Sequence, residues 1–313
     1  MIETKISLPK VSILIPVFNR KDYISECIQS ALNQTFTDFE VVVVDNASDD
    51  GTWEICQKLA AKDVRVRIFH NDSNIGPVLN WQRCFEEARG MYGKILFSDD
   101  LMAPDYLEKT LPFLKDPNVG FVFSLTEIGT NPGVGKVTCG WKRESGKYSS
   151  ESFIESSLFY GNVPVSPGAA LFRMTDLRQN LKLEIPSPSF DDFLSHGAGP
   201  DLLLYLLTAL GYCKVAFVSE PLSFFRSHDG SISIASDRAF LFDRYLQAKI
   251  YFASEHCDSS LLKAFLIYGW VKVCRNFRKP LLPKKFLTKF LDHPPSLSIL
   301  DALSVLCFLK RTV

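Results

Sequence analysis

Two adjacent carboxylates, Asp99 and Asp100, are the residues of this chain best placed to do chemistry. They end the run Phe97-Ser98-Asp99-Asp100, which follows the apolar stretch Gly93 to Leu96. A buried strand does not hold two bare carboxylates, so the pair should lie at the exposed end of a strand. Paired carboxylates at such an end suit a hard divalent cation held against phosphate oxygens. The structural alternative is an Asp-rich turn that leads into a helix near Pro104.

The elements that would position this turn alternate between strand and helix. Apolar, β-branched runs predict strands at residues 11–18, 39–44, 65–69 and 92–97, and helical spacing predicts helices at 22–33, 52–61 and 77–89. This alternation predicts an α/β protein whose mostly parallel sheet carries helices on both faces. Ligands of such sheets bind beyond the carboxyl ends of the strands. Asn19-Arg20, the stretch Asp45 to Gly51 and Ser98 to Asp100 all fall at those ends.

The rest of the chain has a less regular pattern. Its expected elements are strands at 119–124, 169–173 and 212–218, a loop or hairpin at 129–146, a helix at 201–210 and an exposed polar loop at 221–233. After Asp237 the pattern is mostly helical and is interrupted by prolines. This change of pattern predicts a C-terminal helical extension.

Composition excludes several classes of protein. The 313 residues are 46% hydrophobic and 22% charged with zero net charge, which is typical of a globular protein and argues against a nucleic-acid binder. None of the eight cysteines forms a CxxC pair, so a zinc or redox motif is not expected. A signal peptide, a transmembrane-length apolar run, a dinucleotide fingerprint and a Walker A motif are not found either. We therefore expect a soluble, cytoplasmic protein.

Several short motifs, in order, resemble the opening of family 2 glycosyltransferases with the GT-A fold. They are Val11 to Arg20, Gln34-Thr35-Phe36, Val44 to Thr52, Asn74-Ile75-Gly76, Asn80 and Phe97 to Asp100. The resemblance is close over residues 10–115 and looser to about 235. It implies a GT-A domain at 1–236, with a nucleotide-sugar-binding half (10–115) and an acceptor-binding half (116–236). The helical, basic extension at 237–313 lies outside the resemblance and is predicted from its pattern alone.

The resemblance also implies a donor site and a metal. The nucleotide-sugar-binding residues that it implies are Pro16, Val17, Phe18, Arg20, Asp45, Asn80, Ser98, Asp99 and Arg226. Mn²⁺ or Mg²⁺ is expected at Asp99 and Asp100, with His228 as a further ligand. Many members of the family carry Asp-x-Asp-Asp, whose first acid is replaced here by Phe97. Which of the two aspartates contacts the ion directly is left open.

A base must deprotonate the acceptor hydroxyl, and Asp201 is the first candidate. It begins an apolar helix in Gly199-Pro200-Asp201-Leu202, where the resemblance implies an acidic pair whose second member is the base. Pro200 replaces the first member of that pair. The alternative is that Asp201 only stabilises the start of the helix. Asp191 and Asp192 are the competing candidates.

The C-terminal extension is basic, with 13 Lys and Arg against 6 Asp and Glu from Asp237 onward. Between residues 271 and 291 the basic residues interleave with apolar ones, which suits peripheral contact with an anionic membrane. That contact would place the protein at the inner face of the cytoplasmic membrane, beside a lipid-linked acceptor. The alternative is a helix face that packs on the protein core or on a second subunit in a homo-oligomer.

Taken together, these features predict an inverting glycosyltransferase of the bacterial cell-surface polysaccharide type. It would move a sugar from a nucleotide-diphosphate sugar, UDP- or dTDP-linked, to a hydroxyl of a glycan or lipid-linked acceptor. A catalytically inactive nucleotide-sugar-binding or scaffold module of the same fold is the alternative, because Phe97 and Pro200 both replace acids.

Overall fold

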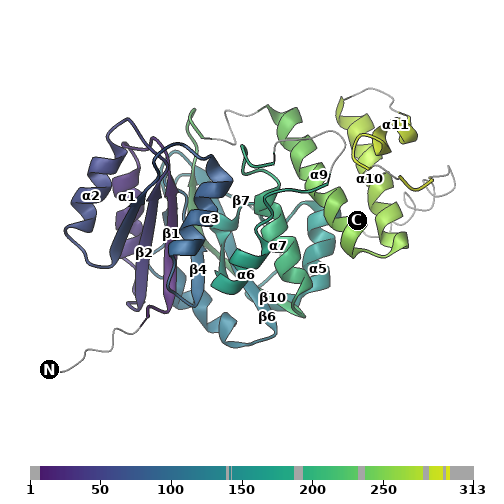
Figure 1. Ribbon diagram of the computed structural model, residues 1–313. Helices are drawn as coiled ribbons and strands as arrows, with labels where there is room; N and C mark the ends of the chain where they lie inside the picture. Colours follow the sequence, from purple (N-terminus) through teal and green to yellow (C-terminus); the bar gives the residue numbers. More distant parts are fainter. Residues whose placement is uncertain are drawn as a thin grey trace.

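The first half of the chain forms the predicted alternation of strands and helices (Figure 1). The computed structural model describes residues 8–138, 141, 143–186, 193–231, 237–277, 282–291 and 294–296. The first strands are β1 (Val11–Val17), β2 (Phe39–Asp45), β3 (Val66–His70) and β4 (Tyr92–Ile95). The helices between them are α1 (Ile24–Leu32), α2 (Thr52–Ala60) and α3 (Pro77–Glu87). All of these strands pair in parallel, so their carboxyl ends meet at one edge of the sheet.

The second half mixes strand directions and contains shorter elements. Its strands are β5 (Leu101–Met102), β6 (Val119–Gly129), β7 (Lys136–Thr138), β8 (Gly146–Ser149), β9 (Ala170–Arg173) and β10 (Lys214–Arg226). Its α-helices are α4 (Tyr106–Thr110), α5 (Ser150–Glu155), α6 (Met174–Asn180) and α7 (Pro200–Leu210). Single turns of other helix types are η1 (Leu111–Lys115), η2 (Ser156–Tyr160) and η3 (Pro167–Ala169).

The strands form one sheet whose main path runs β3-β2-β1-β4-β9-β6-β10-β5. Strand β9 is antiparallel to both of its neighbours, β4 and β6. Strand β6 therefore runs in the same direction as β4, and β10 pairs with β6 in parallel. As a result, the carboxyl end of β10 lies at the same edge as the ends of β1, β2 and β4.

The prediction of an exposed polar loop at 221–233 is wrong for its first six residues, because these residues belong to β10, which continues to Arg226. Leu222, Ser223 and Phe224 are buried there. The pairing of β10 with β6 shifts register on both sides of Pro221. A proline has no N–H for the ladder, and an irregularity in the pairing accommodates it. The proline therefore marks a bulge within the strand and not the strand's end.

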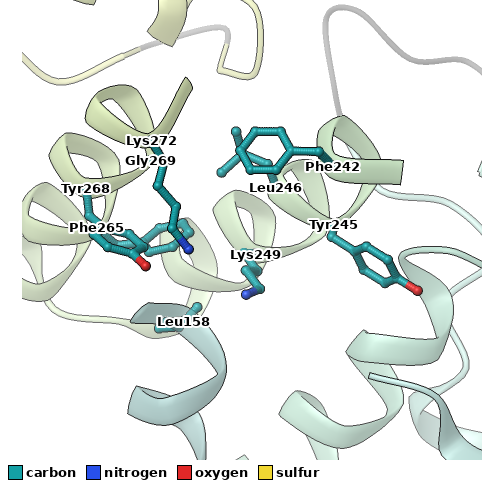
Figure 2. A pocket seen from close by; sticks show the side chains of 9 residues that line it. All are labelled: Leu158, Phe242, Tyr245, Leu246, Lys249, Phe265, Tyr268, Gly269 and Lys272. Carbon is teal, nitrogen blue, oxygen red and sulfur yellow. The ribbon is translucent and has the colours of Figure 1, made fainter. Parts of the chain in front are cut away.

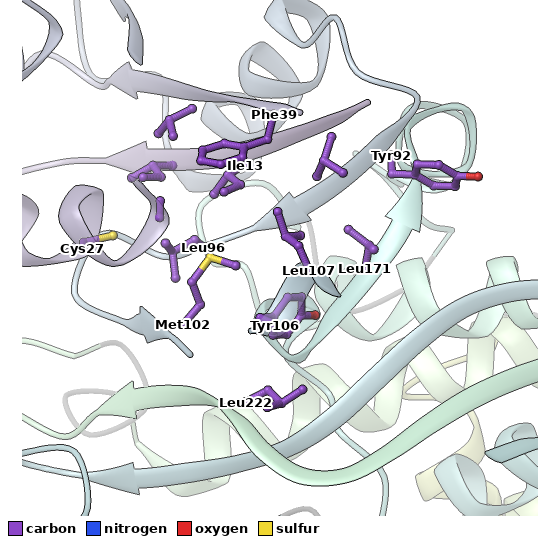
Figure 3. Packing of buried hydrophobic residues seen from close by; sticks show 14 of the residues in the cluster. Ile13, Cys27, Phe39, Tyr92, Leu96, Met102, Tyr106, Leu107, Leu171 and Leu222 are labelled. Atoms are coloured by element: carbon purple, nitrogen blue, oxygen red, sulfur yellow. The ribbon is translucent and has the colours of Figure 1, made fainter. Parts of the chain in front are cut away.

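Alternate side chains of the sheet pack into two separate cores. Ile13 and Ile15 of β1 point to the face that α1 and α4 cover, whereas Leu14 points to the face that α3, α6 and α7 cover. Figure 3 shows part of the first core, where Phe39 lies beside Ile13 and Tyr106 lies near Leu107. Burial of both faces explains why the first strands read as continuous apolar runs.

The C-terminal extension forms the helices α9 (Arg238–His256), α10 (Ser259–Phe277) and α11 (Pro283–Leu287), as its pattern predicts. These helices lie at the opposite end of the molecule from α1 and α2 (Figure 1). They share a third hydrophobic cluster with α7, to which Leu202, Leu203 and Leu206 contribute. Among the described residues, no helix is long and apolar enough to span a membrane.

Candidate active site

The turn after β4 contacts the segments that follow β1 and β10. The Oδ2 atom of Asp99 lies 2.9 Å from Nε2 of His228 and 3.5 Å from Nε of Arg20. The ring of His228 packs against Tyr23, with 4.7 Å between ring centroids. Arg20 also donates to the carbonyl oxygen of Gly230 at 3.1 Å. Three strand ends therefore supply one cluster of a carboxylate and basic side chains.

Arg226, the last residue of β10, holds this turn in place. Its backbone N–H donates to Oδ1 of Asp100 at 2.9 Å, and its Nε donates to the carbonyl oxygen of Asp99 at 3.0 Å. Its guanidinium also forms an ion pair with Glu26 at 2.6 Å, and only 9% of the side chain is exposed. These contacts give Arg226 a structural role in fixing the two aspartates.

The two aspartates differ in their surroundings. Asp100 is buried, and burial raises the pKa of its carboxyl well above the usual range, with the negative charge of Asp99 adding to the effect. Lys94 of β4 is also fully buried and donates to the carbonyl oxygen of Gly168. Burial lowers the pKa of Lys94 to about 7, against the opposing effect of Asp100. Asp99 has a more exposed side chain and is the better placed of the pair to meet a ligand.

At the end of β2, the carboxylate of Asp45 is completely buried. It accepts hydrogen bonds from the hydroxyl of Ser48 at 2.5 Å and the backbone N–H of Ser48 at 3.0 Å. Nδ1 of His70 lies 3.0 Å from Oδ2, the oxygen that also accepts the backbone N–H of Ser48, and the imidazole ring packs on Trp53. The structure thus places Asp45 within the turn that shapes this end of the sheet.

The remaining predicted donor residues occupy different environments. Phe18 is 40% exposed beyond the end of β1, whereas Pro16 and Val17 are buried within the strand. Asn80 is buried on α3, where it donates to the carbonyl oxygen of Val44 at 3.1 Å and accepts from Asn71 at 3.0 Å. Ser98 is buried in the turn. Of these residues, Phe18 presents the largest apolar surface at the edge.

Asp201 lies in the first turn of α7 and is 7% exposed. Its Oδ1 accepts from the backbone N–H groups of Gly199 at 2.8 Å and Leu202 at 2.7 Å. Its Oδ2 accepts from the hydroxyl of Tyr245 on α9 at 2.7 Å. Burial raises the pKa of this carboxyl to about 7, although all three hydrogen bonds oppose the shift. A carboxylate that titrates near neutrality can act as a base at physiological pH.

The structure does not connect Asp201 with the cluster around Asp99. Within the described residues, its carboxylate bonds only Gly199, Leu202 and Tyr245. The competing candidates, Asp191 and Asp192, lie outside the residues that the structure describes.

Sequence reasoning missed three residues that support the site. The position of His70 was predictable, because it ends the strand next to β2 and pairs with Asp45 in the parallel register. Lys94 is a lone cation within an apolar strand, which is a signal for a buried partner. Tyr245 gave no local signal, since it lies 44 residues beyond Asp201 on another helix.

A family model described as glycosyl transferase family 2 matches residues 12–180, more than half of the chain. The protein belongs to this family. This family 2 member is 34% identical over 116 residues to the putative teichuronic acid biosynthesis glycosyltransferase TuaG of Bacillus subtilis, covering 37% of the chain and 46% of the relative. It is 40% identical over 127 residues to chondroitin synthase of Pasteurella multocida, covering 40% of the chain and 13% of that protein. The matched region therefore spans less than half of either relative.

Solved structures show the same fold. The structure of Staphylococcus aureus TarS residues 1–349 in complex with UDP-GlcNAc superposes with a TM-score of 0.66 at 18% identity, covering 86% of this chain and 73% of that one. The mannosyltransferase PcManGT from Pyrobaculum calidifontis, in complex with GDP-Man and Mn²⁺, superposes with a TM-score of 0.50 at 17% identity, covering 98% and 81%. The predicted GT-A fold is confirmed.

Proposed function

We propose that this protein transfers a sugar, with inversion at the anomeric carbon, from a nucleotide-diphosphate sugar to a hydroxyl of a glycan or lipid-linked acceptor. The observation that carries the proposal is the meeting of Asp99, His228 and Arg20 at the ends of β4, β10 and β1 in a family 2 protein. Basic groups around one carboxylate at this edge suit a diphosphate and a cation together. The protein would act in the biosynthesis of a surface polysaccharide, and the reaction would take place in the cytoplasm.

On the donor side, the strand ends offer an apolar face and polar groups. Phe18 would pack against the base, and Arg20 would approach the phosphates. Asp45 would meet the base only after its turn rearranged, because the carboxylate is completely buried and bonded to Ser48 and His70. A UDP- or dTDP-linked sugar is the proposed donor.

The residues around Asp99 fit a divalent metal that is completed by the donor. Within the described ranges, no three His, Cys, Asp or Glu side chains form a metal-binding group. A Mg²⁺-type site often has only one or two protein carboxylates, with phosphate oxygens and water as the other ligands. Asp99 and Asp100, with His228 beside Asp99, would hold such an ion. When bound, Mn²⁺ or Mg²⁺ neutralises charge on the departing nucleoside diphosphate.

On the acceptor side, Asp201 would take the proton of the attacking hydroxyl. Its two backbone hydrogen bonds fix one oxygen, and Tyr245 orients the other. The acceptor hydroxyl would approach Oδ2, where the phenol of Tyr245 stabilises the ionised form. Pro200, which replaces the usual first acid of the pair, lies at the N1 position of α7, where a proline is well tolerated.

For the basic tail, the side chains of α11 and of the turn that follows it favour packing over insertion into a membrane. Phe286, Leu287 and Phe290 are buried in the cluster that α9 and α10 share, whereas Lys284 and Lys285 are exposed. A membrane contact through 271–291 would therefore rest on the lysines. Sedimentation of the double variant Lys284→Gln/Lys285→Gln with anionic vesicles tests it, and unchanged binding relative to the parent would oppose it.

The proposed activity is tested first by donor binding. We expect a UDP- or dTDP-sugar, with Mn²⁺ or Mg²⁺, to raise the melting temperature, because a ligand that binds the folded state stabilises it. Asp99→Asn should lose this shift, whereas Glu86→Gln, which removes an exposed acid near the end of α3 and away from the carboxyl ends of the strands, should keep it. Donor binding without hydrolysis or transfer, across a panel of glycan and lipid-linked acceptors, would instead support the inactive binding module.

A further inference from the structure

A cavity in the C-terminal extension has one lining residue, Tyr245, that is also the partner of Asp201, and its other lining residues take no part in the proposed sugar transfer. It has a volume of about 150 Å³ and lies between α9, α10 and η2 (Figure 2). Its lining residues are Leu158, Phe242, Tyr245, Leu246, Lys249, Phe265, Tyr268, Gly269 and Lys272. At roughly 30 Å³ per water molecule, the space equals about five waters, which is enough for a phosphate group and the first carbons attached to it.

The charge of this cavity is positive. Lys249 on α9 and Lys272 on α10 both line it, and among the residues that the structure describes no lining side chain carries a carboxylate. Figure 2 shows the two amino groups directed toward the space between the helices. Burial, together with the positive charge of Lys272, lowers the pKa of Lys249 to about 8. An anion between the two ammonium groups would relieve this repulsion.

The position of each lysine suggests how a ligand would enter. Lys249 lies within the cavity, where its Nζ donates to the carbonyl oxygen of Ser157. Lys272 is exposed, and its ammonium lies 4.8 Å from the centroid of the Tyr268 ring. One lysine thus marks the inner wall and the other the opening to solvent.

The rest of the lining is apolar and would not favour a bare inorganic ion. Leu158, Leu246 and Phe265 are buried, and Phe242 is half-buried. The hydroxyl of Tyr268 donates to the carbonyl oxygen of Phe159 and that of Tyr245 donates to Asp201, so both phenols direct their polar ends at the protein. Apolar walls next to paired cations match a ligand with both an anionic head and a hydrocarbon part.

We propose that this cavity binds a phosphate ester with an apolar chain, its phosphate between Lys249 and Lys272 and its chain along Phe242 and Leu246. The ester has two chemical sources, a lipid headgroup or a soluble alkyl phosphate. The proposal concerns binding alone and stands independently of the sugar transfer proposed above.

Calorimetric titration of the full chain with octyl phosphate, inorganic phosphate and octanol tests the proposal. We expect octyl phosphate to bind at least tenfold more tightly than inorganic phosphate, and octanol not to saturate. Lys249→Gln and Lys272→Gln should each weaken octyl phosphate at least fivefold, and Lys249→Arg should keep most of the affinity. Lys263→Gln on α10, which removes the same charge outside the cavity lining, should bind as the parent does.

Three results would overturn the proposal. They are the absence of saturable octyl phosphate binding, equal affinities for octyl phosphate and inorganic phosphate, and equal weakening by Lys263→Gln and Lys249→Gln. Because Lys249 also bonds Ser157, Lys272→Gln at the exposed opening serves as the variant least able to disturb folding. Co-sedimentation with phosphatidylcholine vesicles, with and without phosphatidic acid, then separates the sources. Recruitment that Lys272→Gln abolishes supports a lipid ester, and octyl phosphate binding without recruitment supports a soluble one.

Discussion

The two acidic regions of this protein are built in opposite ways. Asp99 has Arg20 and His228 beside it, and Arg226 fixes the turn from behind. Asp201 accepts two backbone N–H groups and one phenol, and no cation contacts its carboxylate within the described residues. The first arrangement suits a ligand with negative charge, because basic side chains and a bound cation can balance that charge together. The second keeps a carboxylate close to its neutral form, which suits a proton acceptor.

This difference shows that the surroundings of an aspartate determine which role its carboxylate can have. At the strand ends, the partners come from loops that converge because the strands are parallel. At α7, the partner Tyr245 comes from the extension, which shares a core with α7. Variants of each region should therefore fail in different assays.

The largest effect is expected for Asp201→Asn in sugar transfer. Loss of a general base lowers the rate by about 10²–10⁴-fold, and donor binding should be unchanged because Asp201 does not contact the Asp99 cluster. The measurement is single-turnover transfer beside a donor titration. Glu86→Gln serves as the control. Near-normal turnover of Asp201→Asn would move the role of base to Asp191 or Asp192.

Asp99→Asn should show the reverse profile and weaken the donor. Removing one partner of a close charge pair costs about 2–5 kcal/mol, so we expect a loss of donor affinity of about 30-fold or more when metal is present. The measurement is donor titration with and without Mn²⁺. A variant that binds donor normally but fails in transfer would contradict the contrast between the two regions.

Asp201→Asn should also stabilise the protein at alkaline pH. The folded pKa of about 7 lies above the usual 3.8, so the folded state binds the proton more tightly and loses stability as the pH rises from about 4 to 7. Asparagine has no proton to lose and therefore removes this loss of stability. The gain in the free energy of unfolding is at most about 4 kcal/mol, because each unit of difference between the folded and unfolded pKa is worth about 1.36 kcal/mol. Thermal melting should show a larger gain at pH 8 than at pH 5, and an equal gain at both would refute the raised pKa.

Tyr245→Phe should have the smallest effect. The hydrogen bond from Tyr245 lowers the pKa of Asp201, so its loss should raise that pKa further. The acidic limb of the transfer rate should then move to higher pH, with a several-fold loss near pH 6.5 and little change above pH 8. Tyr251→Phe, on the same helix, should keep the parent profile. A uniform loss at every pH would indicate a merely structural role.

The sequence predicts those parts of the molecule in which a local pattern also determines which distant segments meet. Parallel strands bring their carboxyl ends together, so the strand pattern placed Arg20 and Asp99 at one edge, whereas His228 was expected there only from the family resemblance. The bulge at Pro221 and the bond between Tyr245 and Asp201 were not predictable. Each depends on packing between segments that are far apart in the chain, and the local periodicity of the sequence does not indicate such packing.

The pairing of β6 with β10 has a consequence for how this protein could diversify. The two strands are neighbours in the sheet, although residues 130–213 separate them in the chain. Arg226 and His228 are thus held by β6 and by the turn after β4, and the length of the intervening segment does not set their position. Strand β9 of that segment lies between β4 and β6, so the loops of the segment, and not this strand, are where insertions can change the surface while Arg226 and His228 keep their geometry.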